Sequence, residues 1–253
     1  MKCHTLLLWL FIKVPQVLYA QSNGLSSAQQ MVTDKLIRAA SSGDKQQIAA
    51  MVVYPLRRTY PLSDVKNKAE MLIRFDTIFD DALLCRIARS KADDWSVVGW
   101  RGLMLDKGVL WMTDAGGITA INYQSEEEKI LLESAIQKDK QQLPPSLQQF
   151  AAPRYKIVTK RYRIRIDELA GGQWRYACWS LKSRKQEPDL VLYNGVFEIQ
   201  GTGGNHTITF TNDLYRYTVA INRLGTPETP EAVLTVYKGV MLLLNDPGKI
   251  IRN

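Results

Sequence analysis

Few of the residue types that carry hydrolytic or metal chemistry occur in this sequence. Its 253 residues include two histidines and three cysteines. His4 and Cys3 lie in the apolar N-terminal segment, which leaves His206, Cys85 and Cys178 for the rest of the chain. One histidine cannot build a two-histidine metal site, and two cysteines are too few for structural zinc. We therefore expect no metal ion and no cofactor, and we interpret His206, which follows a glycine turn, as a surface residue.

Carboxylates are the remaining candidates for catalysis. Asp76 and Asp80 lie four residues apart and could share one face of a helix. A carboxylate that is held in an apolar pocket has a raised pKa and can act as a general acid or base. Asp80 follows Phe79 among apolar positions, so it is the one weak candidate for a catalytic residue. The alternative is an ordinary solvated helix flank.

Three tryptophans occur in one short stretch, DDWSVVGWRGLMLDKGVLWM. Packing in a core explains them most simply, because both faces of the expected strands are apolar. The functional interpretation is a ligand pocket lined by Trp100 and Trp111, with Arg101 or Tyr123 at its rim. The turn at DKG sets the register, and it places Trp111 either beside Trp100 or opposite Leu103.

The sequence KRYRIRID alternates basic and apolar side chains with the period of a strand. Arg161, Arg163 and Arg165 are therefore expected to form one exposed basic face, with the apolar residues between them buried. Residues 141–253 hold fifteen basic and nine acidic side chains, so most of the net charge of +8 lies there. Such a face favours an acidic partner or an anionic envelope polymer. A solvated basic surface without a ligand is the alternative.

The N-terminus has the order of a secretory signal peptide. Lys2 is followed by seven apolar residues at 6–12 and by the sequence VLYA, which predicts cleavage after Ala20. Seven apolar residues are far fewer than the ~20 that span a bilayer. We therefore expect a periplasmic or secreted protein with no membrane span in the mature chain. We expect no nucleic acid as a partner in that compartment.

Export permits a disulfide bond between Cys85 and Cys178. The geometry of a disulfide is demanding, however, and the two cysteines lie in different segments of the chain. Cys85 also continues an apolar stripe of helical spacing through Phe75 and Ile78, which indicates a buried free thiol. Both states remain open at this stage.

Helical spacing of apolar residues predicts helices over 26–40 and 67–90. The sequence GDKQQIAAMV begins another helix, with Asp44 as its cap. YPLRRTYPL predicts an extended edge segment, because its prolines exclude a helix. Three antiparallel strands are expected at 96–105, 109–113 and 118–123.

This order of elements resembles the NTF2-like, cystatin-type α+β cone. The matching residues are the helix start GDKQQIAAMV, the helix 67–90 and the strands that end in GGITAINY, within residues 25–123. The stretch is similar to exported bacterial proteins of unassigned function, so the resemblance implies a fold and no activity. Some NTF2-like dehydratases use a His–Asp pair, and residues 25–123 contain no histidine.

A polar helix and a proline-containing stretch follow, and short strands with a period of two continue to the end of the chain. Asn194-Gly195 is the strongest hairpin signal among them. The expected fold class is α+β, with a cone followed by a small antiparallel β barrel or sandwich. The expected division is a signal peptide at 1–20, the cone at 21–123, a helix and linker at 124–153 and the β domain at 154–253.

Together these patterns favour an exported, non-catalytic binding protein of the bacterial envelope. Its partner would be an envelope protein, an envelope polymer or a small ligand. The alternative is an enzyme, an isomerase or hydrolase, that uses carboxylate chemistry near Asp80 in the cone.

Overall fold

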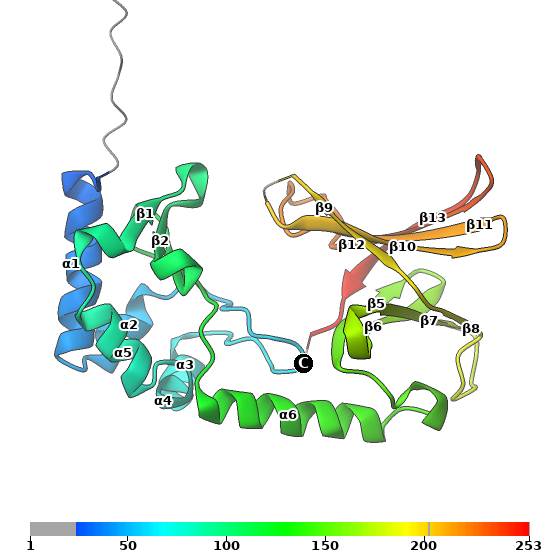
Figure 1. The fold of residues 1–253 in the computed structure, drawn as a ribbon, viewed down its shortest axis with the longest axis horizontal. Coiled ribbons are helices and arrows are strands. Elements are labelled where there is room, and N and C mark those ends of the chain that lie inside the picture. The colour runs from blue at the N-terminus through cyan, green and yellow to red at the C-terminus, as the bar shows by residue number, and fades with distance from the viewer. Residues whose placement is uncertain (1–23, 202, 253) are drawn as a thin grey trace, which may run out of the picture.

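A computed structural model describes residues 24–201 and 203–252, and it shows an α+β protein with two units joined by a helix (Figure 1). The expected signal peptide at 1–20 lies outside the described residues. Within the described residues, no helix has the length and apolar character needed to cross a membrane.

The N-terminal unit begins with helices whose caps are visible in the sequence. Ser26 forms a capping box with Gln29, and the side chain of Asp44 accepts a hydrogen bond from the amide of Gln47. The helices of this unit are α1 (Ser27–Ser41), α2 (Lys45–Met51), α3 (Lys68–Ile73), α4 (Phe75–Ile78) and α5 (Asp81–Ala88). The predicted helices at 26–40 and from residue 44 are therefore confirmed.

The single helix predicted over 67–90 is wrong, because the chain forms three short helices there. Arg74 is the C-terminal cap of α3, and Phe79 is the C-terminal cap of α4. Asp80 then takes an extended conformation and caps the start of α5. The first part of the apolar stripe packs in one core, since Met71, Phe75 and Ile78 are buried there. The stripe fails after the break at Asp80, because Leu83 is buried in α5 and Cys85 is only half-buried.

Four short strands form the sheet of this unit: β1 (Trp95–Val97), β2 (Leu103–Leu105), β3 (Leu110–Met112) and β4 (Ile118–Ile121). They pair antiparallel in chain order. The strand predicted over 96–105 is wrong, because a turn at 99–102 folds it into a hairpin. Gly99 and Gly102 both have positive φ, and a Cβ on Gly102 would lie 2.2 Å from the carbonyl oxygen of Met112. Trp111 pairs with Met104, so neither expected register occurs.

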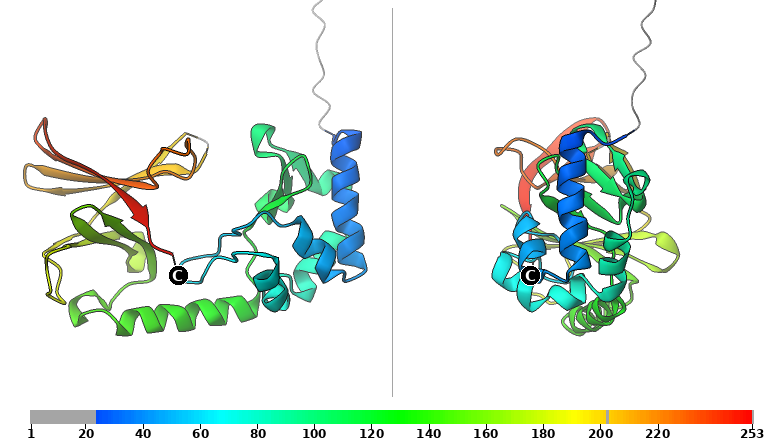
Figure 2. Two further views of the ribbon diagram at one scale, coloured as in Figure 1. Left: turned by 180° about the vertical axis from the view of Figure 1, so that it is seen from behind. Right: turned by 90° about the vertical axis from the view of Figure 1, so that its left-hand side faces the viewer.

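Helix α6 (Glu126–Gln141) connects the two units and runs below both of them in Figure 1 and in the view from behind in Figure 2. It is polar on nearly all sides, as expected of a helix that bridges domains. Its first turn is fixed by a buried ion pair between Arg58 and Glu128, and Arg58 also donates a 2.6 Å hydrogen bond to the carbonyl oxygen of Ile121. The hydroxyl of Ser125 donates to the carbonyl oxygen of Thr77. These buried bonds hold the start of α6 against the N-terminal unit.

In the described part of the C-terminal unit, nine strands form one curled antiparallel sheet. They are β5 (Ala152–Thr159), β6 (Tyr162–Glu168), β7 (Trp174–Ser180), β8 (Leu190–Leu192), β9 (Val196–Gln200), β10 (Asn205–Asn212), β11 (Tyr215–Ile221), β12 (Ala232–Lys238) and β13 (Met241–Ile250). Their order across the sheet is β8-β7-β6-β5-β13-β12-β11-β10-β9. Figure 1 shows the curl as two layers, with β5–β8 below and β9–β13 above.

The core of this unit lies between the two layers. Ile164 and Ile166 of β6 face Ile208 and Phe210 of β10 within one buried cluster. The expected hairpin at Asn194-Gly195 is wrong, because the strands that it joins, β8 and β9, lie at opposite ends of the sheet. A Cβ on Gly195 would lie 2.5 Å from the ring of Phe210, so the chain turns a tight corner there.

Candidate anion-binding site

The face of β5–β7 that points away from the core carries the basic residues. Arg163 and Arg165 share this face, as the alternation in the sequence predicted, and Lys156 lies beside them on β5. The exposure expected for the whole face is wrong in part, because only 3% of the Arg165 side chain is exposed. Arg161 precedes β6 and lies exposed at the hairpin turn.

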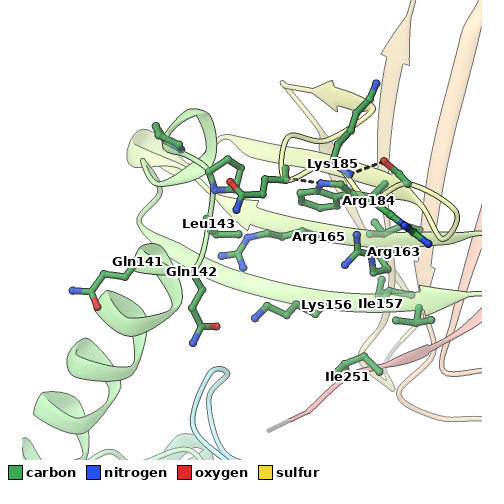
Figure 3. A pocket seen from close by; sticks show the side chains of 17 residues that line it. Gln141, Gln142, Leu143, Lys156, Ile157, Arg163, Arg165, Arg184, Lys185 and Ile251 are labelled. Carbon is green, nitrogen blue, oxygen red and sulfur yellow. Dashed lines mark hydrogen bonds between the residues drawn. The ribbon is translucent and has the colours of Figure 1, made fainter.

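A pocket of about 740 Å³ opens on this face, between the end of α6 and the loop from β7 to β8. Figure 3 shows Lys156, Arg163 and Arg165 on the strands, with Gln141 and Gln142 on one side and Arg184 on the other. We call it the basic pocket. Its lining residues are Gln141, Gln142, Leu143, Pro144, Pro145, Lys156, Ile157, Val158, Arg163, Ile164, Arg165, Trp179, Ser183, Arg184, Lys185, Gln186 and Ile251.

A chain of paired charges lies behind the pocket, and two of its members, Lys156 and Arg165, line the pocket. Asp139 of α6 binds the Lys156 ammonium at 2.7 Å and the Arg165 guanidinium at 2.6 Å. Arg165 also binds Asp167, and Asp167 in turn accepts a 2.7 Å hydrogen bond from Arg175. Three cations thus share two carboxylates, and this buried group carries one excess positive charge.

The pKa values in this cluster follow from its pairing. Burial alone would raise the pKa of Asp139, but the hydrogen bonds from Arg165 and Lys156 outweigh burial and hold it below its ordinary value. Burial would lower the pKa of Lys156, but its interactions with Asp139 and Tyr60 together outweigh burial and raise it. The three groups are therefore ionised at neutral pH.

The linker between α6 and β5 covers part of this face. Arg175 donates to the carbonyl oxygens of Leu147 and Gln149, at 2.6 and 3.2 Å. The Arg165 guanidinium lies 4.8 Å from the centre of the Phe150 ring. Arg165 is buried because these linker residues lie over it.

Donors remain free at the pocket even after this pairing. Nη1 of Arg165 is buried and has no hydrogen-bond partner among the described residues. Arg163 lies 5.9 Å from the centre of the Trp179 ring and forms none of the ion pairs found in the described chain, nor do Arg184 and Lys185. A buried donor without a partner is costly, and arginine donors fit the oxygens of phosphate or carboxylate. The pocket therefore carries basic donors of the kind that suit an anion.

A second basic cleft, of about 370 Å³, lies between the two units. Arg57, Arg223 and Arg252 line it, and Lys156 lines both this cleft and the basic pocket. Burial and the charges of Arg252 and Arg223 lower the pKa of Arg57. Arg252 is ion-paired with Glu231 at 2.6 Å, so this cleft is neutralised in part by its own residues.

The aromatic pocket expected in the N-terminal unit is not assembled. Trp100 is 68% exposed in the turn between β1 and β2, and Trp95 is the tryptophan that is buried there. Arg101 instead lies over the Trp111 ring, 5.2 Å from its centre. Tyr123 donates a 2.7 Å hydrogen bond to Asp80, and burial together with this bond raises the pKa of Tyr123 to about 12.

Asp80 has a structural role in this arrangement. One of its carboxylate oxygens accepts a 2.9 Å hydrogen bond from the amide of Leu83 at the start of α5, and the other accepts from Tyr123. Asp76 does not share its site, because it pairs with Lys45 at 2.7 Å. Both oxygens of the candidate catalytic carboxylate are therefore already bound within the protein.

The open question of the disulfide is settled, and the burial of Cys85 and of His206 differs from expectation. Cys85 and Cys178 are free, and they lie in different units. Cys85 is only half-buried, whereas Cys178 lies in the β core, where burial raises its thiol pKa to about 11. His206 is buried and not on the surface, with Nε2 2.8 Å from the hydroxyl of Tyr155 and Nδ1 2.9 Å from the carbonyl oxygen of Gly204.

Sequence reasoning missed most of the residues that shape the basic pocket. From the sequence, Asp139 is one of many polar residues in a predicted helix, and Asp167 and Arg175 are polar residues in predicted strands with no sign that they are buried. The available signal was the pattern Arg165-x-Asp167, which places opposite charges on the same face of β6.

Comparison of this chain with protein-family models, with curated proteins and with solved structures finds no match. The candidate site therefore rests on the geometry of this chain.

Proposed function

We propose that this protein is an exported, non-catalytic binding protein of the bacterial envelope that holds an acidic group of its ligand in the basic pocket. The observation that carries the proposal is the set of cations that line the pocket and form no ion pair in the described chain, Arg163, Arg184 and Lys185, together with Arg165, whose buried Nη1 has no hydrogen-bond partner there. A guanidinium in this state gains a charge-assisted hydrogen bond when an anion enters.

The lining of the pocket supports binding over catalysis. The residues that line it include no carboxylate, histidine or cysteine, and Ser183 is the one hydroxyl among them. Trp179, Leu143 and Pro144 add apolar surface beside the cations. This combination suits a ligand that carries an anionic group on a less polar body, such as an envelope polymer, an acidic protein segment or a small acid.

Two structural expectations remain part of this proposal. The N-terminal unit, with helices first and an antiparallel sheet after them, is proposed to be related to the NTF2-like cone. The curled sheet of the C-terminal unit is proposed to be a small barrel, because β8 and β9 at its two ends are joined by only Tyr193, Asn194 and Gly195. Export rests on the signal-like sequence at 1–20.

The test is a calorimetric titration with inorganic tripolyphosphate as the probe, at low ionic strength where charge interactions are least screened. The variant Arg163→Gln removes a cation that lines the pocket. The matched control is Arg161→Gln, which makes the same change of charge two residues away and outside the pocket.

We expect Arg163→Gln to weaken binding about tenfold, since one charge-assisted hydrogen bond is worth roughly 1.5–3 kcal/mol. Arg161→Gln should bind as the unchanged protein does. Equal losses in the two variants would show that only the net charge of the domain attracts the probe. That result, or an absence of binding to the unchanged protein, would contradict the proposal.

A further inference from the structure

The turns of two neighbouring hairpins form an exposed apolar apex on the C-terminal unit. Leu214 lies in the turn between β10 and β11, and Val240 lies in the turn between β12 and β13. The amide of Gly239 donates a 2.9 Å hydrogen bond to the carbonyl oxygen of Leu214, so the two turns are in contact. Val240 is 100% and Leu214 68% exposed, and Met241 is also exposed. In Figure 1 these turns project from the side of the unit that is far from α1.

Directly behind the apex, each face of the sheet carries a tyrosine paired with a cation. Tyr215 is the cross-strand neighbour of Lys238, whose ammonium lies 5.6 Å from the centre of its ring. Arg216 is the cross-strand neighbour of Tyr237, at 4.8 Å. Successive residues of a strand point to opposite faces, so the two pairs lie on opposite sides of the sheet. The apex is thus backed by a belt of tyrosine and basic side chains.

We propose that this apex docks on the surface of an anionic phospholipid bilayer. Tyrosine, lysine and arginine favour the headgroup region, where an aromatic ring or an aliphatic stem is shielded and the polar end stays wet. Val240 lies in the two-residue turn just beyond the Lys238–Met241 pair, so its side chain projects past the belt. Segments that lie in the bilayer interface reach a depth of about 5–10 Å. With the belt among the headgroups, Val240 reaches the start of the acyl chains.

The local charges fit an anionic surface. Lys238 and Arg216 are basic, and Asp213 is the one acidic residue in the two turns. Because Asp213 adjoins Leu214, the hairpin of β12 and β13 enters more deeply than its neighbour. The apex lies outside the basic pocket, so this proposal and the proposed function can fail separately.

Pairing with a second copy through the edge of β13 fits the structure less well. β5 pairs with β13 only at residues 248–250, which leaves residues 241–247 as an open edge. A β-bulge opposite Val236 and Tyr237 distorts this edge, and Pro247 lies on it. Both features are ways in which proteins prevent edge pairing. The apex is also a narrow projection and not a broad flat face, as a protein interface of about 800 Å² per partner requires.

The experiment is co-sedimentation of residues 21–253, which include every described element, with vesicles of phosphatidylethanolamine with or without phosphatidylglycerol. The variant Val240→Asp changes a fully exposed side chain and leaves the packing intact. Its control is Ile73→Asp, an equal change at an 84% exposed position on α3. A second variant, Lys238→Gln, removes one cation of the belt.

We expect binding to the anionic vesicles, a loss of about tenfold or more in Val240→Asp and no loss in Ile73→Asp. Lys238→Gln should bind about fivefold more weakly, and added salt should weaken binding further. Failure of the unchanged protein to bind, or equal binding by the Val240→Asp and Ile73→Asp variants, would overturn the proposal. So would a dimer in sedimentation without vesicles that Val240→Asp converts to a monomer, because the apex would then be an interface between copies.

Discussion

Replacing Asp139 with asparagine should separate the stability of this protein from its affinity for anions. The carboxylate of Asp139 is buried and binds both Lys156 and Arg165. Asparagine keeps the shape of the side chain and loses the charge, which leaves the three cations of the cluster, Lys156, Arg165 and Arg175, with the one carboxylate of Asp167. Because Asp139 is also the residue that ties the end of α6 to the sheet, the loss affects the contact between the helix and the β domain.

The magnitude follows from the burial of the pair. Removing one partner of a buried ion pair costs about 3–5 kcal/mol, because the remaining charge stays desolvated. A loss of 3 kcal/mol corresponds to a fall in Tm of about 10 °C for a protein of this size. At the same time Lys156 and Arg165 gain free donors beside the pocket, so the affinity for tripolyphosphate should rise.

Calorimetric melting and titration of the same samples measure both effects. Glu133→Gln is the control, since Glu133 is an exposed acid on the same helix. The pH dependence gives a further check. The pKa of Asp139 lies below its ordinary 3.8, so its contribution is complete above that value and is lost as the pH falls through the lower folded pKa. The difference between the unchanged protein and Asp139→Asn should therefore shrink in strong acid. Equal Tm values for Asp139→Asn and Glu133→Gln at pH 7 would refute this account of the charge cluster.

Three other predictions concern the rest of the fold. Trp95→Ala should lower the free energy of unfolding, measured by urea denaturation, by about 3–5 kcal/mol because Trp95 is buried. The exposed Trp100→Ala should lower it by less than about 0.5 kcal/mol. Equal losses would contradict the placement of the two rings. Glu128→Gln should lower the Tm of the protein by about 10 °C, because Arg58 then lies buried without its carboxylate. An unchanged Tm would show that this ion pair does not stabilise the fold. Burial lowers the pKa of His206 below its ordinary 6.5. As the pH falls below 6.5 the unfolded chain therefore binds a proton before the folded protein does, and the β domain should lose stability. Denaturation midpoints at pH 7.5 and 5.5 check this, and His206→Gln should remove the difference.

Local signals in the sequence predicted where the first two helices begin and which face of β6 is buried. Ser26 and Asp44 announce the starts of α1 and α2 because a side-chain cap acts within three residues. The alternation around Ile164 and Ile166 identified the buried face of β6, because a strand's alternation also depends only on neighbouring residues. The class of the protein, α+β, followed from these signals.

Features that depend on distant residues were missed. The sequence GWRG reads as part of a strand, and the carbonyl group of Met112 excludes any side chain at Gly102. Asn194-Gly195 reads as a hairpin, and the ring of Phe210 makes it a corner. The sequence predicts an exposed Arg165, but Asp139, 26 residues earlier, pairs with it and the linker around Phe150 covers it. None of these neighbours could be identified from a period or a motif.

The location of a bound anion tests the central claim most directly. Crystals of the protein grown with tungstate, which scatters strongly and has the tetrahedral shape of phosphate, would place the anion by its anomalous signal. The account predicts a peak in the basic pocket, within hydrogen-bond distance of one of its unpaired cations, Arg163, Arg184 or Lys185. A peak only in the cleft of Arg57 and Arg223, or a basic pocket without a peak in crystals where tungstate binds elsewhere, would contradict it.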